Sequence, residues 1–264
     1  MKRWNEGRLL ALDVDGVMIE PCGSFESCAG AAIRELAPGI VWSDELYWRF
    51  KRLPGFNNDF RMVAAVAALF AAGGMDGLTT ALEAGRLPPG IEERIEETEP
   101  ACKARVQHHY KDVAHLERPL ITLAELESLT GWDVAIMTGR PPEELAMAFR
   151  VLGFELPAAC DSKPEFRKPA PGGLLHLADT FGATRVYFVG DTIDDATCLA
   201  SAHAERPGLD LNFVAVGKLR HEIAKPGDLK HENLREFIAA AAAAKPPGFD
   251  VTVTISCAAL RECK

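Results

Sequence analysis

The feature that most constrains this chain is a short apolar run, residues 9–12, that ends in Asp13, Val14, Asp15 and Gly16. An apolar run of this length, bounded by glycine, is typical of a strand buried on both faces of a parallel sheet. Asp13 and Asp15 then leave the strand on the same side, because side chains alternate along a strand. Two carboxylates this close need a shared proton, a bound cation or a separation beyond the strand end. In the alternative, one aspartate caps a helix and the other is solvated.

The composition is that of a globular chain long enough for one large domain, or for a core domain with an insertion. The 264 residues are 48% hydrophobic and 25% charged, and the formal net charge is −9 without a cluster of Lys or Arg. This charge argues against nucleic acid and anionic membranes as partners. No run approaches the ~18 apolar residues of a membrane span, and we therefore expect no membrane segment.

The cysteines and the amino terminus indicate a cytoplasmic protein. The seven cysteines are an odd number at scattered spacings, with no Cys-x-x-Cys pair and no histidine placed to complete a zinc site. Asp13 and Asp15 interrupt the apolar run near the amino terminus, which argues against a signal peptide. The sequence leaves the oligomeric state open, with a homodimer among the alternatives.

The segment 18–117 has helical patterns and no strand signal before about residue 118. Its apolar residues recur at helical spacing, and Ser, Asn, Pro and Gly punctuate it at the expected helix ends. The expected helices cover about residues 24–36, 43–53, 58–73 and 88–110, the last being one long kinked helix or two. The segment therefore predicts an all-helical domain inserted after the first strand.

From residue 118 onward, apolar strands alternate with amphipathic helices. The expected strands are 133–137, 158–160, 186–189 and 211–216. This alternation predicts an α/β fold, a Rossmann-like parallel sheet with helices on both faces. We assign residues 1–17 and 118–248 to this core. In the tail, 249–264, apolar residues alternate with polar ones, which predicts an added strand at a sheet edge or against the core.

Residues that could take part in catalysis or binding follow several of these strands, and they should gather at one edge of the sheet. Ligands bind at the carboxyl ends of the strands in open α/β sheets. Carboxylates, a hydroxyl with a free backbone amide, and a lysine at one edge are what a metal-assisted phosphoryl transfer requires. The candidates are Asp13 with Asp15, Thr138 with Gly139, Lys168, and Asp191 with Asp195.

These motifs resemble those of the haloacid dehalogenase-like hydrolase superfamily in order, spacing and strand context. The matching stretches are DVDGV at 13–17, IMTGR at 136–140, KPAP at 168–171 and GDTIDD at 190–195. The resemblance covers about residues 8–20 and 118–220. The helical segment 18–117 is similar to the cap that these enzymes carry after their first motif.

The resemblance implies a phosphatase that acts on a small phosphorylated metabolite. Asp13 is expected to be the nucleophile that forms an aspartyl-phosphate, a step that divides one difficult displacement into two easier ones. Asp15 is expected to protonate the leaving oxygen and then to activate water. Thr138 and the Gly139 amide would hold phosphate oxygens, while Lys168 would offset negative charge.

The same resemblance implies Mg²⁺ as the cofactor, because this hard cation prefers oxygen ligands. The expected ligands are the Asp13 carboxylate, the Asp15 main-chain carbonyl, Asp191 and Asp195. Two alternatives to a phosphatase stay open. A phosphomutase would pass the same intermediate to a sugar, and a non-catalytic phosphometabolite-binding protein would keep the fold without turnover.

Other residues have competing interpretations. Lys163 also precedes a proline, but we prefer Lys168 because its KPAP motif leads directly into an amphipathic helix. Arg140 is expected to be structural rather than catalytic, since an arginine beside a helix start often bonds backbone or solvent. Within the helical segment, Arg52, Asn57 and Asn58 could contact the substrate, and roles in the loop and in helix capping are at least as well supported.

Overall fold

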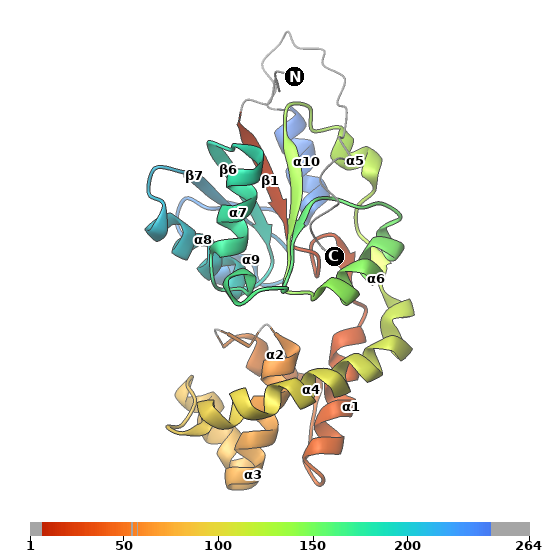
Figure 1. Cartoon of the computed structure of the whole chain (residues 1–264), viewed down its shortest axis with the longest axis vertical. Helices are drawn as coiled ribbons and strands as arrows, with labels where there is room; N and C mark the ends of the chain where they lie inside the picture. The colour runs from red at the N-terminus through yellow and green to blue at the C-terminus, as the bar shows by residue number, and fades with distance from the viewer. Residues whose placement is uncertain (1–6, 54, 57, 244–264) are drawn as a thin grey trace. The chain divides into compact units, whose positions relative to one another are not determined.

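The computed structural model describes residues 7–53, 55–56 and 58–243, and the chain divides into two compact units (Figure 1). Met1–Glu20 and Arg118–Lys264 form the first, here the sheet unit, and Pro21–Glu117 form the second, the helical unit. The expected insertion began at residue 18, whereas residues 18–20 belong to the sheet unit. The tail predicted to add a strand, 249–264, lies outside the described residues.

The sheet unit contains a six-stranded sheet in the order β5-β4-β1-β6-β7-β8, and every pairing in it is parallel. The strands are β1 (Arg8–Leu12), β4 (Asp133–Met137), β5 (Ala158–Ala159), β6 (Arg185–Gly190), β7 (Asp210–Ala215) and β8 (Leu229–Lys230). Residues 9–12 are fully buried. The predicted Rossmann-like α/β fold is confirmed, with its longest strands at the centre.

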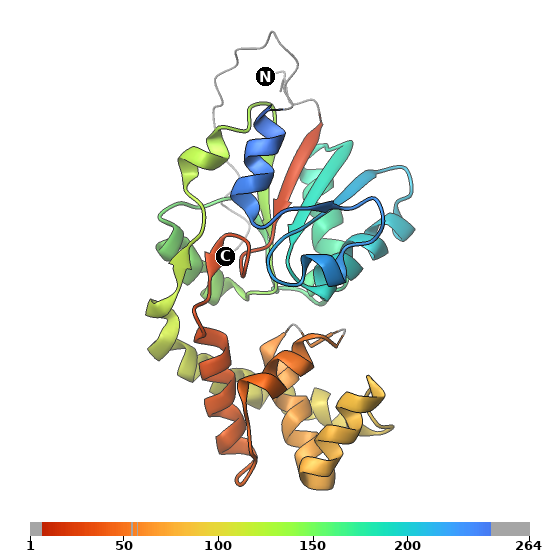
Figure 2. The same cartoon turned by 180° about the vertical axis from the view of Figure 1, so that it is seen from behind.

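Helices cover both faces of this sheet, and the alternation of side chains along β1 separates the two layers (Figures 1 and 2). Leu10 and Leu12 pack with α5 (Leu123–Glu127), α6 (Pro142–Leu152) and α10 (Leu234–Ala243). Leu9 and Ala11 pack with α7 (Gly172–Phe181), α8 (Ile193–Glu205) and α9 (Arg220–Ile223). A strand with two buried faces is apolar at every position, which explains the unbroken run at the start of the sequence.

A second, two-stranded sheet pairs β2 (Ile19–Glu20) antiparallel to β3 (Arg118–Pro119). The expectation that no strand lies between residues 18 and 118 was therefore wrong at β2. Each strand has only two residues, which is too short for a periodic signal, and the partner strand lies far away in the sequence. The two passages of the chain between the units are thus fastened together within the sheet unit.

The helical unit consists of four helices and a 3₁₀ turn within the described residues. They are α1 (Ser24–Leu36), α2 (Asp44–Lys51), α3 (Asp59–Ala84), α4 (Ile91–Val113) and the turn Ala114–Leu116. The predicted end of the third helix at Gly73 and Gly74 is a break in α3, where both glycines have non-helical backbone angles before the helix resumes. Pro100 lies within α4, so residues 91–113 form one helix rather than two.

One helix contradicts the expectation that no segment has the length and apolar character of a membrane span. An 18-residue window of α3 has a mean hydropathy of 1.6. Core helices of globular proteins meet the same criterion, and 44% of that window is buried inside the structure. The interruption at Gly73 and Gly74 and the packing of α3 against α4 and α1 are typical of such a core helix.

A polar cluster lies in the interior of the helical unit, where α1 and α4 meet. The buried Glu117 accepts hydrogen bonds from the hydroxyl of Tyr110 at 2.8 Å and from that of Ser24 at 3.1 Å. The Tyr110 ring stacks on Phe25, with ring centroids 5.4 Å apart. A buried carboxylate needs such partners, so the cluster holds the two helices in one register.

Candidate active site

Asp13 directly follows β1 and is 3% exposed at the carboxyl edge of the sheet. Its N–H donates to the main-chain oxygen of Val189 in β6 at 3.0 Å, which continues the strand pairing to Asp13 itself. The ammonium of Lys168 lies 2.8 Å from Oδ1 of Asp13. The carboxylate is therefore held in one place by the sheet and has the buried Lys168 cation beside it.

Asp195 binds the same lysine from the start of α8, where its Oδ1 lies 2.6 Å from Nζ of Lys168. Its Oδ2 accepts from the N–H of Asp191 at 3.2 Å, and from the N–H and hydroxyl of Thr192 at 3.0 and 2.7 Å. The N–H of Asp195 donates back to Thr192 Oγ1, which completes a capping box. Asp195 thus anchors both the lysine and the loop after β6, and both its oxygens are engaged.

Asp191 is bonded differently, because its buried Oδ1 has no hydrogen-bond partner among the described residues. Asp13, Asp191 and Asp195 each offer an oxygen, all within 4.8 Å of one another, so they could hold a metal ion. Gly16 allows this approach. It has a φ of +70°, and a Cβ there would lie 2.0 Å from Oδ2 of Asp191. An unpartnered buried carboxylate oxygen is costly, so these residues fit a hard divalent cation.

The electrostatics of the cluster also favour a cation. Burial raises the pKa of Asp13 to about 7, with Asp195 and Asp15 adding to the rise and Lys168 opposing it. Burial, with the charges of Asp195 and Asp13, also raises the pKa of Asp191 well above its usual range. Burial alone lowers the pKa of Lys168, but the carboxylates of Asp13 and Asp195 outweigh it and raise that pKa. One lysine therefore does not balance the carboxylates of the site.

Thr138 and Gly139 follow β4, which neighbours β1 in the sheet. Thr138 is fully buried, and its Oγ1 accepts the N–H of Arg140 at 3.2 Å. Among the described residues, neither the Thr138 hydroxyl nor the Gly139 N–H donates to an acceptor. Two unused donors at the carboxyl edge of the sheet can hold anionic oxygens.

Arg140 has a role that the sequence analysis missed. Its Nε and one terminal nitrogen donate to Oδ2 and Oδ1 of Asp15, at 3.1 and 2.6 Å. It also bonds backbone as expected, since its other terminal nitrogen donates to the main-chain oxygen of Glu144 at 3.4 Å. The position of Arg140 next to Thr138-Gly139 was the available signal, because that loop and the end of β1 share one sheet edge.

The sequence matches the family of haloacid dehalogenase-like hydrolases over residues 8–203, a range that includes every residue of this site. The chain belongs to the haloacid dehalogenase-like hydrolase family. The resemblance carried by the four motifs is thereby confirmed. Comparison with functionally curated proteins finds no significant match.

Solved structures with the fold of this haloacid dehalogenase-like hydrolase include a phosphatase and a phosphomutase. Phosphatase Tt82 from Thermococcus thioreducens is 19% identical with a TM-score of 0.64, over 90% of this chain and 100% of that one. A hydrolase from Pseudomonas syringae is 18% identical with a TM-score of 0.57, covering 90% and 98%. Beta-phosphoglucomutase from Clostridium difficile is 15% identical with a TM-score of 0.56, covering 89% and 96%.

The residues of the hydrolase's helical unit that were singled out from the sequence occupy different settings. Arg52 is exposed at the carboxyl end of α2. Asn58 caps α3, and its Oδ1 accepts the N–H groups of Phe60 and Arg61 at 2.9 and 3.2 Å. Asn57 lies outside the described residues. The capping interpretation of Asn58 is therefore confirmed, and a substrate contact by Arg52, Asn57 or Asn58 stays a prediction.

Of the two candidate lysines, Lys163 and Lys168, only Lys168 lies among the carboxylates of the hydrolase. It is 6% exposed and contacts both Asp13 and Asp195. Lys163 is exposed, and its Nζ lies 5.0 Å from the ring centroid of Phe166. The preference for Lys168 thus agrees with where the fold places the two side chains.

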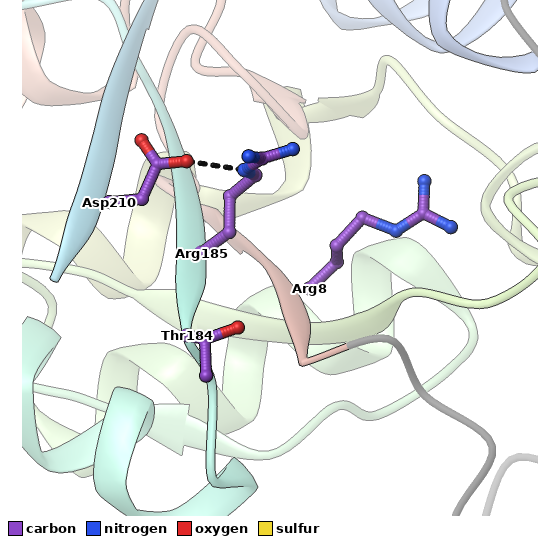
Figure 3. A pocket seen from close by; sticks show the side chains of 4 residues that line it. All are labelled: Arg8, Thr184, Arg185 and Asp210. Atoms are coloured by element: carbon purple, nitrogen blue, oxygen red, sulfur yellow. Dashed lines mark hydrogen bonds and ion pairs between the residues drawn. The ribbon is translucent and has the colours of Figure 1, made fainter.

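A separate pocket lies at the opposite edge of the sheet (Figure 3). It is lined by Arg8, Thr184, Arg185 and Asp210, and Arg185 forms an ion pair with Asp210. These residues stand at the amino ends of β1, β6 and β7, whereas Asp13 follows the carboxyl end of β1. The pocket is therefore separate from the candidate active site of the hydrolase.

Proposed function

We propose that this chain is a magnesium-dependent phosphatase that hydrolyses a small phosphorylated metabolite through an aspartyl-phosphate on Asp13. The observation that carries the proposal is the buried Oδ1 of Asp191, which has no partner among the described residues and lies within the carboxylate cluster of Asp13. Lys168 beside Asp13, and the unused donors of Thr138 and Gly139, support it.

In the first step an oxygen of Asp13 attacks phosphorus as the bond to the leaving oxygen breaks. Asp15 gives its proton to that leaving oxygen, which departs as an alcohol. Thr138 and the Gly139 amide hold the phosphoryl oxygens, and Lys168 offsets their negative charge.

In the second step a water oxygen bonds to phosphorus and the bond between phosphorus and Asp13 breaks. Its electron pair returns to the Asp13 carboxylate, and the proton of the water passes to Asp15. Inorganic phosphate leaves, and Asp15 is protonated again for the next substrate. The net reaction is the hydrolysis of a phosphate monoester by one water molecule.

The Asp13 and Asp191 carboxylates and the Asp15 main-chain oxygen would hold Mg²⁺, and Asp195 lies within the same cluster. When bound, Mg²⁺ supplies positive charge that offsets the repulsion between these carboxylates and a phosphate group. Because Asp195 already accepts from Lys168 and Thr192, we assign it the weaker share of this binding.

The test is phosphate release from a panel of phosphorylated metabolites, with Mg²⁺ and with EDTA. We expect release that requires Mg²⁺ and is lost in Asp13→Asn. Asp210→Asn, at the other edge of the same sheet, is the matched control and should keep the activity. Wild-type hydrolysis that survives both EDTA and Asp13→Asn would overturn the proposal. Phosphate that stays on an organic product would instead support a phosphomutase.

A further inference from the structure

Arg140 and Asp15 form a two-point ion pair whose members differ in exposure. The Arg140 side chain is 2% exposed, whereas that of Asp15 is 31% exposed. Two parallel N–H···O contacts fix the plane of a carboxylate as well as its position. The buried arginine is thus a fixed support, and the carboxylate it holds faces solvent.

The backbone around Arg140 is also held on both sides. Its N–H donates to Oγ1 of Thr138, and its main-chain oxygen accepts the N–H of Asp161 at 3.0 Å. The side chain donates to the main-chain oxygen of Glu144 in the first turn of α6. These contacts connect the placement of Asp15 to the same loop that presents Thr138 and Gly139.

We propose that Arg140 is a positioning residue that holds the Asp15 carboxylate where it exchanges protons with the leaving oxygen and with water. This inference rests on the proposed function, in which Asp15 is the acid and base. Arg140 does not supply the proton itself, because a guanidinium stays protonated in proteins. Its effect therefore passes through Asp15, and only steps that use Asp15 should depend on it.

An aryl phosphate separates these steps. Nitrophenolate is a good leaving group, so its departure from 4-nitrophenyl phosphate needs little proton donation, and phosphorylation of Asp13 depends weakly on Asp15. Hydrolysis of the aspartyl-phosphate still requires Asp15 to take a proton from water. A loss of Asp15 positioning should therefore slow the second step far more than the first.

The experiment compares pre-steady-state kinetics of the wild type, Arg140→Gln, Arg140→Lys and Asp15→Asn with this substrate. We expect Arg140→Gln to release a burst of nitrophenolate of one molecule per enzyme molecule. Its steady-state turnover should then be at least about tenfold slower than that of the wild type. This loss is a part of the ~10²–10⁴-fold contribution of general acid–base catalysis. Arg140→Lys should behave similarly, because lysine lacks the two-point contact. The double variant that combines Arg140→Gln with Asp15→Asn should be no slower than Asp15→Asn alone.

A structural role would give a different pattern. Arg150, an exposed arginine of α6, supplies the matched control, and Arg150→Gln should behave as the wild type. If Arg140→Gln slows the burst and the steady state equally, or if the double variant is slower than Asp15→Asn, the proposal is overturned. Arg140→Lys, with its buried charge retained, decides the case if Arg140→Gln does not fold.

A second measurement does not depend on turnover. In the wild type, the Nε–H resonance of Arg140 should be protected from exchange with water, and Asp15→Asn should shift it and remove that protection. An Arg140 resonance that Asp15→Asn leaves unchanged overturns the inference. A wild type that hydrolyses no phosphate ester overturns the proposed function and, with it, the role of Arg140 in proton transfer, whereas a failed resonance test in an active enzyme overturns only the inference.

Discussion

Lys168 and Asp13 form a buried ion pair, with Nζ of the lysine 2.8 Å from Oδ1 of the aspartate and the two side chains 3% and 4% exposed. The lysine forms an ion pair with Asp195 at the same time. It therefore joins the end of β1 to the start of α8 through charge.

Replacing Lys168 by methionine should lower the free energy of unfolding by about 3–5 kcal/mol at neutral to alkaline pH, because Asp13 and Asp195 would stay buried without their cation. Urea unfolding in the presence of EDTA measures this loss of stability. In a separate assay with Mg²⁺, the rate of phosphate release should also fall. Lys163→Met is the control, since that lysine is exposed and its contact with the Phe166 ring is worth about 0.5–1 kcal/mol. Equal losses in the two variants would contradict the prediction.

The stabilising effect of Mg²⁺ should increase with pH. Folding raises the pKa of Asp13 from 3.8 to about 7 and raises that of Asp191, both because of burial. In the metal-free protein, these groups therefore support folding at low pH, and that support is lost as the pH rises through about 7. Mg²⁺ must displace their protons, so it binds better once they have left.

Thermal unfolding with Mg²⁺ and with EDTA, at about pH 5.5 and about pH 8, measures this increase. The Mg²⁺-induced rise in melting temperature should be larger at the higher pH. Asp191→Asn should reduce that rise. In EDTA, the same substitution should reduce the fall in melting temperature between the lower and the higher pH. A Mg²⁺ effect of the same size at both pH values would count against a metal site in this cluster.

Gly16→Ala should disrupt the site by a direct clash. Its added Cβ would lie 2.0 Å from Oδ2 of Asp191, and its φ of +70° also strains any side chain. Gly85→Ala is a matched control, because Gly85 has a φ of +63° but no atom within 4 Å of the added Cβ among the described residues. Both variants should lose about 1–2 kcal/mol from backbone strain. Only Gly16→Ala should also lose phosphate release and the Mg²⁺-dependent rise in melting temperature.

Tyr110→Phe should destabilise the helical unit by about 1–3 kcal/mol, because Glu117 would lose its 2.8 Å hydrogen bond inside the protein. The ring and its stacking on Phe25 would be kept, so packing changes little. Tyr187→Phe is the comparison, since the Tyr187 hydroxyl bonds no described residue. Chemical unfolding of both variants gives the difference, and a larger loss in Tyr187→Phe would refute the assignment.

The central strands and the helices beside them could be predicted because their signals are local. Residues 134–137 are an apolar run that predicts a strand over 133–137, and the structure has β4 over those same residues. The break at Gly73 and Gly74 was visible, but the return to helix beyond it was not, because α3 packs against α4 and α1 and such tertiary packing leaves no local signal. The pairing of β2 with β3 could not be found for a similar reason, since its partners are far apart in sequence.

For the site, residue type and strand position indicated which side chains share the sheet edge, but not how they bond. Asp15 was assigned a chemical role without its partner, because the contact with Arg140 joins loops that follow two different strands. Asp195 was expected to be a ligand like Asp191. The two differ because Asp195 faces the amino end of α8, where Thr192 and the backbone take one of its oxygens.

The short pairing of β2 with β3 places Glu20 opposite Arg118, one residue on either side of the helical unit. The helical unit is therefore one inserted segment whose two ends lie side by side in the sheet unit. The length of such a segment adds little to the entropy cost of closing the chain. Such a segment can be lengthened, trimmed or exchanged for a foreign domain while the register of the sheet is kept. The pairing of β2 with β3 thus makes the helical unit a replaceable module, and joining another domain at residues 20 and 118 is a direct route to chimaeras of this fold.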